Sequence, residues 1–212
     1  FFKVFSIDTL TVYDSTTFVS ISRYIAILPD TIGKWTIEGV SSKEFSSKFY
    51  KPQKIDSISP WAEDTTTKSK VWWGRFYVKT NLKYSKLFFI SLFGDTVKLY
   101  CPDTLKGFIE KRSGNALPLK ERDVQFGGFQ IYLSFNLLND NKIQTFYFRI
   151  GTKDKIPGGF VASSSSIHEQ EIIYLNEIKV RFILGILAGI FLLAAIINLT
   201  FFISLKDFAY LY

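Results

Sequence analysis

The sequence is poor in cysteine, histidine and methionine, and these shortages exclude several kinds of site. Its 212 residues include one cysteine (Cys101), one histidine (His168) and no methionine. A single cysteine can form neither an intramolecular disulfide nor a cysteine-rich metal centre. A single histidine leaves no second imidazole for a zinc site. We therefore expect no metal and no cofactor. Cys101 is interpreted as a thiol at a strand end, and His168 as a solvated side chain, with a pH sensor as the alternative.

The absence of methionine, with Phe1 as the first residue, indicates a processed or truncated chain. Concentrated positive charge is also missing, although the formal net charge is +7. The lysines are scattered, which is typical of a solvated surface, whereas nucleic-acid binding requires a basic stripe or a recognised motif. We expect no nucleic-acid partner. An anionic ligand or membrane surface stays open.

Paired carboxylates are missing as well. A glycoside-acting enzyme on a β-sandwich would need two carboxyl groups on facing strands, about 5 or 6.5–9.5 Å apart. The acidic residues fall mostly in predicted turns, without the spacing of a pair: Asp95, Asp103, Glu110, Glu121 and Asp123. The sequence therefore predicts a protein that is not an enzyme.

One long hydrophobic run is present. Residues 182–205 form a stretch of 24 residues without a charge, and about 20 apolar residues span a bilayer as a helix. This stretch predicts a transmembrane helix. Gly185 and Gly189 allow close approach of another backbone, and Asn198 and Thr200 can hydrogen-bond to other helices. We expect this helix to pack against partner helices.

Upstream of this run the sequence predicts β-strands. Aromatic residues make up 17% of the chain, and they suit pleated, half-buried surfaces. Apolar residues alternate with polar ones in residues 130–137 and 145–150, with an Asn- and Asp-rich turn at 138–142 between them. Further strands are expected at 18–28, 70–80, 86–93 and 94–100. Short strands with short turns favour an all-β fold, an antiparallel β-sandwich.

Two adjacent tryptophans, Trp72 and Trp73, must point to opposite faces of the strand at 70–80, because side chains on a strand alternate. Trp72 shares its face with apolar residues and is assigned to the core. Trp73 shares its face with Arg75, Tyr77 and Lys79. Tyr147 with Arg149, and Tyr100 with Lys98, repeat this composition. Such a surface suits sugar rings or a planar anionic ligand. The alternatives are ordinary packing of arginine over rings, or a face covered by another domain.

The stretch before the hydrophobic run predicts a helix that continues into it. Ser166 and Glu169 form an S-x-x-E capping box. An apolar stripe follows at spacings of three and four: Ile172, Leu175, Ile178 and Phe182. A continuous helix could transmit a shift from domain to membrane, or it could be a passive stalk.

Several ordered motifs resemble those of one receptor family. They are VWWGRFYVKTN at 71–81, GDTVKLY at 94–100, GNALPLKER at 114–122, TFYFRIGT at 145–152 and the hydrophobic run with its flank at 185–212. In this order they resemble the extracytoplasmic sensor domain and first membrane helix of bacterial seven-transmembrane receptors with diverse intracellular signalling modules.

The resemblance implies a jelly-roll-like β-sandwich similar to carbohydrate-binding modules, outside the bacterial cytoplasmic (inner) membrane. Further transmembrane helices and a cytoplasmic signalling module would follow, and a homodimer is possible. The expected organisation lists N-terminal strands at 1–29, a sensor domain at 30–162, a linker and juxtamembrane helix at 163–181, a transmembrane helix at 182–205 and a cytoplasmic flank at 206–212.

We therefore expect a ligand-sensing receptor fragment that binds a carbohydrate or another small polar molecule. The residues expected to contact the ligand are Trp73, Arg75, Tyr77, Arg122 and Arg149. The alternative is a single-pass, membrane-anchored carbohydrate-binding or adhesion module without signalling, whose gene would end soon after Tyr212.

Overall fold

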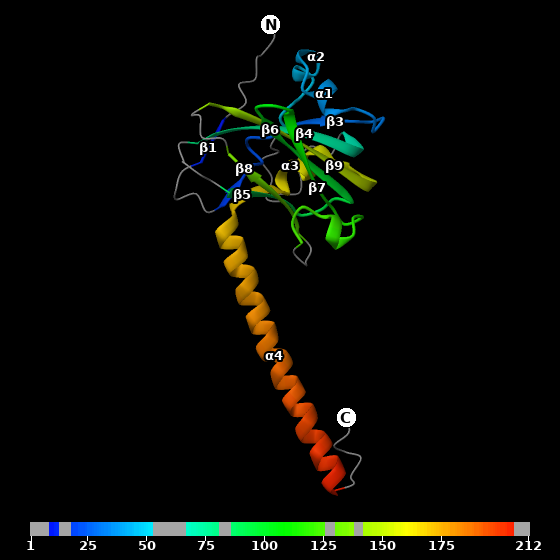
Figure 1. Cartoon of the computed structure of the whole chain (residues 1–212). Coiled ribbons are helices and arrows are strands. Elements are labelled where there is room, and N and C mark those ends of the chain that lie inside the picture. The colour runs from blue at the N-terminus through cyan, green and yellow to red at the C-terminus, as the bar shows by residue number, and fades with distance from the viewer. Residues whose placement is uncertain are drawn as a thin grey trace. The chain divides into compact units, whose positions relative to one another are not determined.

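The computed structural model describes residues 9–12, 18–52, 67–80, 86–125, 130–137 and 142–205. Two β-sheets and one long helix dominate it (Figure 1). The chain divides into two units, Phe1–Gln170 and Glu171–Tyr212. The first unit contains both sheets, and the second contains most of the long helix. Residues 206–212, Asn81 and positions 138–141 of the expected turn lie outside the described residues.

The first sheet has the strand order β1-β4-β9-β6-β7, and β3 also pairs with β4. All its pairs are antiparallel except β1 with β4. Its strands are β1 (Leu10–Val12), β3 (Ala26–Pro29), β4 (Lys68–Thr80), β6 (Thr96–Asp103), β7 (Gly107–Ser113) and β9 (Gln144–Pro157).

The second sheet has the order β2-β10-β5-β8 and is antiparallel. Its strands are β2 (Phe18–Ser20), β5 (Lys86–Ser91), β8 (Ile131–Asn136) and β10 (Ser165–Glu169). The described helices are α1 (Ile37–Val40), α2 (Lys43–Ser46), the 3-10 turn η1 (Leu119–Glu121), α3 (Gly158–Ser163) and α4 (Gln170–Leu205).

The main core lies between the two sheets and follows the alternation seen in the sequence. Ile131, Leu133 and Phe135 of β8 are buried, as are Phe146 and Phe148 of β9. Aromatic rings join the two layers. The ring of Phe76 in the first sheet stacks on Phe146, with centroids 5.3 Å apart, and on Phe89 of the second sheet at 6.1 Å. The predicted β-sandwich is confirmed.

Strand β4 is buried on both faces. Trp72 lies in the main core, where its indole Nε1 donates to the carbonyl of Ile156 at 3.0 Å. Trp73 points the other way, yet its exposure is also 0%. Of the alternatives for this face, the structure shows arginine packed over rings, with Arg149 6.0 Å from the Trp73 ring centre, on a face that is covered. The segment that contains α1 and α2 covers this face (Figure 1). Its apolar side chains form a second apolar cluster with those of the face.

The junction before the hydrophobic run also differs from the expectation. Residues 165–169 are not a linker or a helix cap but strand β10, which pairs with β2 on one side and β5 on the other. Helix α4 begins at Gln170. Backbone pairing on both edges of β10 and the burial of Ile167 in the core stabilise the strand. Together they outweigh the local preference of Ser166 and Glu169 for capping a helix.

Helix α4 has the length and composition to cross a membrane, and none of its apolar window is buried in the structure. No described neighbour would lie within 4 Å of a Cβ atom added at Gly185 or Gly189. Thr200 bonds back to its own helix, donating from Oγ1 to the carbonyl of Ile196 at 2.8 Å. Packing of α4 against partner helices stays a prediction.

Gly74 tests the packing of β4 on β9. It pairs with Phe148, whose ring occupies the place where a Cβ atom at Gly74 would lie. We expect Gly74→Ala to lower the free energy of unfolding by about 1–3 kcal/mol, because overpacking a dense core is destabilising. The measurement is denaturant unfolding of the full chain in micelles. Gly39→Ala, where the new atom finds ordinary contact, is the control. Equal stability of the two variants would contradict this packing.

Candidate functional site

The outer face of the first sheet collects four of the five residues expected to contact a ligand. Trp73, Arg75 and Tyr77 alternate along β4, and the register places Trp73 opposite Arg149 and Arg75 opposite Tyr147 on β9. Directly opposite residues of an antiparallel pair share a face. We call the side chains of Trp73, Arg75, Tyr77, Tyr147 and Arg149 the aromatic-basic face.

Arg122 lies elsewhere. It follows η1, and its Nε donates to the carbonyl of Leu117 at 3.0 Å within the same loop. Among the described residues, its hydrogen bonds do not reach the aromatic-basic face. The described structure therefore gives no contact that brings Arg122 together with the other four residues.

Residues 30–50, which we call the cover segment, lie over the aromatic-basic face. Trp35 packs edge-on against Phe45 with ring centroids 5.0 Å apart. The ring of Phe49 lies 6.2 Å from that of Tyr147. Beneath them Trp73 stacks on Tyr100 at 5.4 Å. Burial of so many rings stabilises the cover segment on the sheet by the hydrophobic effect and by ring contacts.

Asp30 fixes the start of the cover segment. The side chain is 1% exposed, so its charge needs hydrogen-bond donors. Its Oδ1 accepts from the backbone N–H of Gly33 at 2.6 Å, and its Oδ2 accepts from the N–H of Trp35 at 3.1 Å and from the indole of Trp73 at 3.4 Å. Gly33, at φ +72°, allows the chain to turn there. One carboxylate thus holds this turn against the sheet.

Two arginines hold the rest of the cover segment. Arg75, 5% exposed, donates from Nη1 to the hydroxyl of Ser46 at 2.8 Å and from Nη2 to its carbonyl at 3.3 Å. Its guanidinium also lies 4.5 Å from the ring centre of Phe49. Arg149 donates from Nη2 to the carbonyl of Gly33 at 3.0 Å. These acceptors are neutral, and within the described residues neither arginine is ion-paired.

Burial keeps the phenols of this layer protonated. It raises the pKa of Tyr147, although the nearby Arg75 lowers it in part. It also raises the pKa of Tyr100, and Glu110 adds to this effect. At neutral pH both side chains therefore serve as hydrogen-bond groups rather than as acids or bases. Among the residues that the structure describes, no cluster of His, Cys, Asp or Glu could hold a metal ion.

Cys101 of β6 points into the main core. Burial is the first cause that raises its pKa, to about 12. The thiol is therefore uncharged at neutral pH and behaves as a small apolar side chain.

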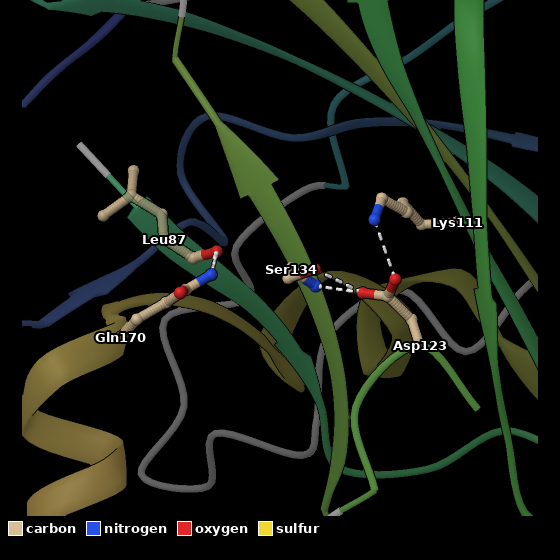
Figure 2. Close-up of polar contacts among 5 residues, drawn as sticks. All are labelled: Leu87, Lys111, Asp123, Ser134 and Gln170. Carbon is tan, nitrogen blue, oxygen red and sulfur yellow. Dashed lines mark hydrogen bonds and ion pairs between the residues drawn. The ribbon is translucent and has the colours of Figure 1, made fainter. Parts of the chain in front are cut away.

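A second set of polar contacts joins the sheets and reaches the start of α4 (Figure 2). The carboxylate of Asp123 accepts from the N–H and hydroxyl of Ser134 on β8 at 2.7 and 2.6 Å, and it pairs with Lys111 of β7 at 2.9 Å. Gln170, the first residue of α4, donates from Nε2 to the carbonyl of Leu87 on β5 at 3.1 Å. The second sheet is thus tied to the first sheet and to the helix start.

The family model 7TMR-DISM extracellular 2 matches residues 22–158. The chain belongs to this family. Its members are the extracellular sensor domains of bacterial seven-transmembrane receptors, so the sheets form a receptor sensor domain and α4 anchors it with the domain outside. The family is not an enzyme family. The resemblance drawn from the ordered motifs is confirmed.

One solved structure with some similarity is the crystal structure of a protein from Shewanella oneidensis. Its sequence is 12% identical to this chain, and the TM-score is 0.16. The match covers 51% of this chain and 72% of that one. None of the curated proteins matches the sequence.

The sequence analysis missed the cover segment and Asp30. The segment reads as polar, with serines and lysines, but its apolar residues Trp35, Ile37, Phe45 and Phe49 are the ones that pack on the sheet. Four aromatic residues within 35–50 were the available signal. The spacing of these aromatic residues fits neither a long helix nor a strand. The structure agrees, since the helices α1 and α2 are only one turn each.

Asp30 is expected to be the main polar anchor of the cover segment. Asp30→Ala removes the side-chain acceptor of three N–H donors. The indole of Trp73 is the buried one, and leaving a buried donor unsatisfied costs about 1–3 kcal/mol. We expect faster hydrogen exchange in residues 31–49 of the full chain in micelles. Asp103→Ala is the control, since that carboxylate also accepts two backbone N–H groups but in an exposed turn. Unchanged exchange in Asp30→Ala would overturn this role.

His168 in β10 predicts a pH dependence of stability. Burial lowers its pKa from the ordinary value of 6.5. Below that value the unfolded chain binds the proton more readily than the folded one, so stability falls as the pH drops and levels off below the folded pKa. We expect the unfolding temperature to fall between about pH 7.5 and about pH 5, and His168→Gln to flatten this part of the curve. Parallel curves for the two proteins would contradict the prediction.

Proposed function

We propose that this sensor domain binds a small polar ligand, such as a carbohydrate, outside the bacterial cytoplasmic membrane and relays binding through α4. Family membership supports the sensing role. Further transmembrane helices and a cytoplasmic signalling module would complete the receptor. The nature of the ligand rests on the aromatic and guanidinium groups of the first sheet.

The burial of the aromatic-basic face divides its residues into two roles within this proposal. Trp73 and Arg75 hold the cover segment, so they affect a ligand through the position of that segment. Tyr77 and Arg149 are only partly buried, and they are the members of this face that we assign to ligand contact, although Arg149 also bonds to Gly33 of the cover segment. Arg122 lies outside this surface and is not assigned to it.

The continuity of β10 with α4 is the observation that carries the relay. β10 is hydrogen-bonded on both edges, to β2 and to β5, and the helix begins at the next residue. Because no loop separates them, a shift or twist of β10 would move the first turn of α4. The bond from Gln170 to Leu87 adds a side-chain tie at the same point (Figure 2).

A membrane-anchored binding module without signalling differs from a receptor in one measurable way. It would bind its ligand while β10 and the start of α4 stay unchanged. A receptor must bind the ligand with different affinities in two conformations, or binding would shift nothing.

The test uses the full chain in lipid nanodiscs. A thermal-shift screen with neutral saccharides, amino acids and organic acids identifies a ligand class, because a ligand of the folded state raises the unfolding temperature. With that ligand bound, we expect altered hydrogen exchange in residues 165–172. Gln170→Leu should reduce this response without weakening binding. Gln125→Leu removes a side-chain hydrogen bond to the carbonyl of Lys120, far along the sequence from the junction, and should leave the response intact. Binding with unchanged exchange at 165–172 would favour the module without signalling.

A further inference from the structure

Three cations form a continuous row across the first sheet. The register pairs Lys98 of β6 with Arg149 of β9 on one side and with Arg112 of β7 on the other. Directly paired residues point to the same face, so the three side chains lie on the outer face of the sheet. We call Arg149, Lys98 and Arg112 the cation row. Trp73 continues the row on β4, next to Arg149.

This arrangement is electrostatically unfavourable without an anion. Neighbouring strands are about 4.8 Å apart, which is less than the screening length of about 8–10 Å, and directly opposed like charges are destabilising. The described structure offers one carboxylate to the row, that of Glu110, whose Oε1 lies 2.9 Å from Lys98 Nζ. Glu38 of α1 is the other acidic group near this part of the sheet, through its effect on Tyr100.

The two guanidinium groups are left without a carboxylate among the described residues. Within the described residues, Arg149 donates to one group, the neutral carbonyl of Gly33, and its buried Nε has no acceptor there. Arg112 is exposed. Two of the three positive charges are therefore uncompensated within the described residues, and both have hydrogen-bond donors to offer.

The row is accessible from one end. Trp73 is fully buried under the cover segment, and Arg149 is partly buried at the margin of that segment, beside Gly33. Exposure then increases along the row: the Lys98 side chain is 34% exposed, and Arg112 is classed as exposed. A ligand can approach from the β7 side and extend toward Arg149. It would meet cationic donors there, while the face of the Trp73 ring is occupied by Tyr100. The site thus selects for negative charge rather than for stacking on a sugar ring.

We propose that the cation row binds a small ligand carrying two or more carboxylate groups. Arginine forks match carboxylates with two parallel hydrogen bonds, and the lysine between them adds a point charge. Glu110 pairs with Lys98 in the structure, and in this proposal it releases the lysine to the ligand. The inference rests on the proposed sensing function and names the chemical class of its ligand. An acidic saccharide and a free dicarboxylic acid share this chemistry.

The experiment measures binding to the full chain in nanodiscs by calorimetry, with digalacturonate, glutarate and the neutral disaccharide galactobiose as probes. We expect at least one of the two acids to bind and galactobiose not to bind. Which acid binds distinguishes a saccharide from a free acid as the source of the carboxylates. Binding should weaken between about 50 mM and about 300 mM salt, as expected for exposed charges.

Substitutions place the site. Arg112→Gln should weaken binding about tenfold or more, because a charge-assisted hydrogen bond is lost, and Arg112→Lys should restore part of the affinity. Lys86→Gln is the control, since it removes one exposed positive charge from the other sheet. Glu110→Gln should strengthen binding, because it removes the competing carboxylate.

Each outcome decides the proposal. Acid binding that Arg112→Gln weakens and Lys86→Gln does not would support it. Acid binding unaffected by Arg112→Gln, binding of galactobiose alone, or no binding of either acid would overturn it. Galactobiose binding that alters hydrogen exchange at 165–172 would leave the sensing function standing without the cation row. Acid binding at the row without that exchange response would keep the site and reject the relay.

Discussion

The burial of two adjacent tryptophans on opposite faces of β4 is the constraint on which the rest of the domain depends. A strand with apolar rings on both faces must be covered twice. Trp72 is buried in the main core, with its ring beside Gly158 of α3, and the cover segment covers Trp73. This requirement explains why the cover segment folds back on the sheet although much of its sequence is polar. It also explains why Asp30, Arg75 and Arg149 form hydrogen bonds to groups of that segment rather than to water.

Local patterns predicted the sandwich well, because alternation along β8 and β9 reports directly which side chains are buried. They failed where pairing partners are remote. β10 has a polar, serine-rich sequence and becomes a strand only because β2 and β5 flank it. β7 carries charges typical of an edge strand and gave no apolar signal. The grouping of Trp73, Arg75, Tyr77 and Arg149 followed from composition, whereas their burial depended on residues 30–50, and Arg122 was grouped with them by resemblance alone.

The two sheets divide the work of the sensor domain. The first presents the charged and aromatic side chains and carries the cover segment. The second contains the strand that leads into the membrane helix. Asp123 joins them, since its carboxylate binds a lysine of one sheet and a serine of the other (Figure 2). A change on the outer face therefore has a route to Gln170 that passes from β7 through Asp123 to β8, and from β8 to its pairing partner β5, whose Leu87 carbonyl accepts from Gln170.

The burial of Cys101 has a practical consequence. It is the one cysteine in the sequence, and in the core its thiol is both shielded and, with a pKa of about 12, almost wholly protonated. Thiol reagents attack the thiolate, so the native chain is close to inert toward them. A cysteine introduced at any exposed position would be the single reactive thiol, and one spectroscopic probe could then report on the cover segment or the helix start without altering the native core.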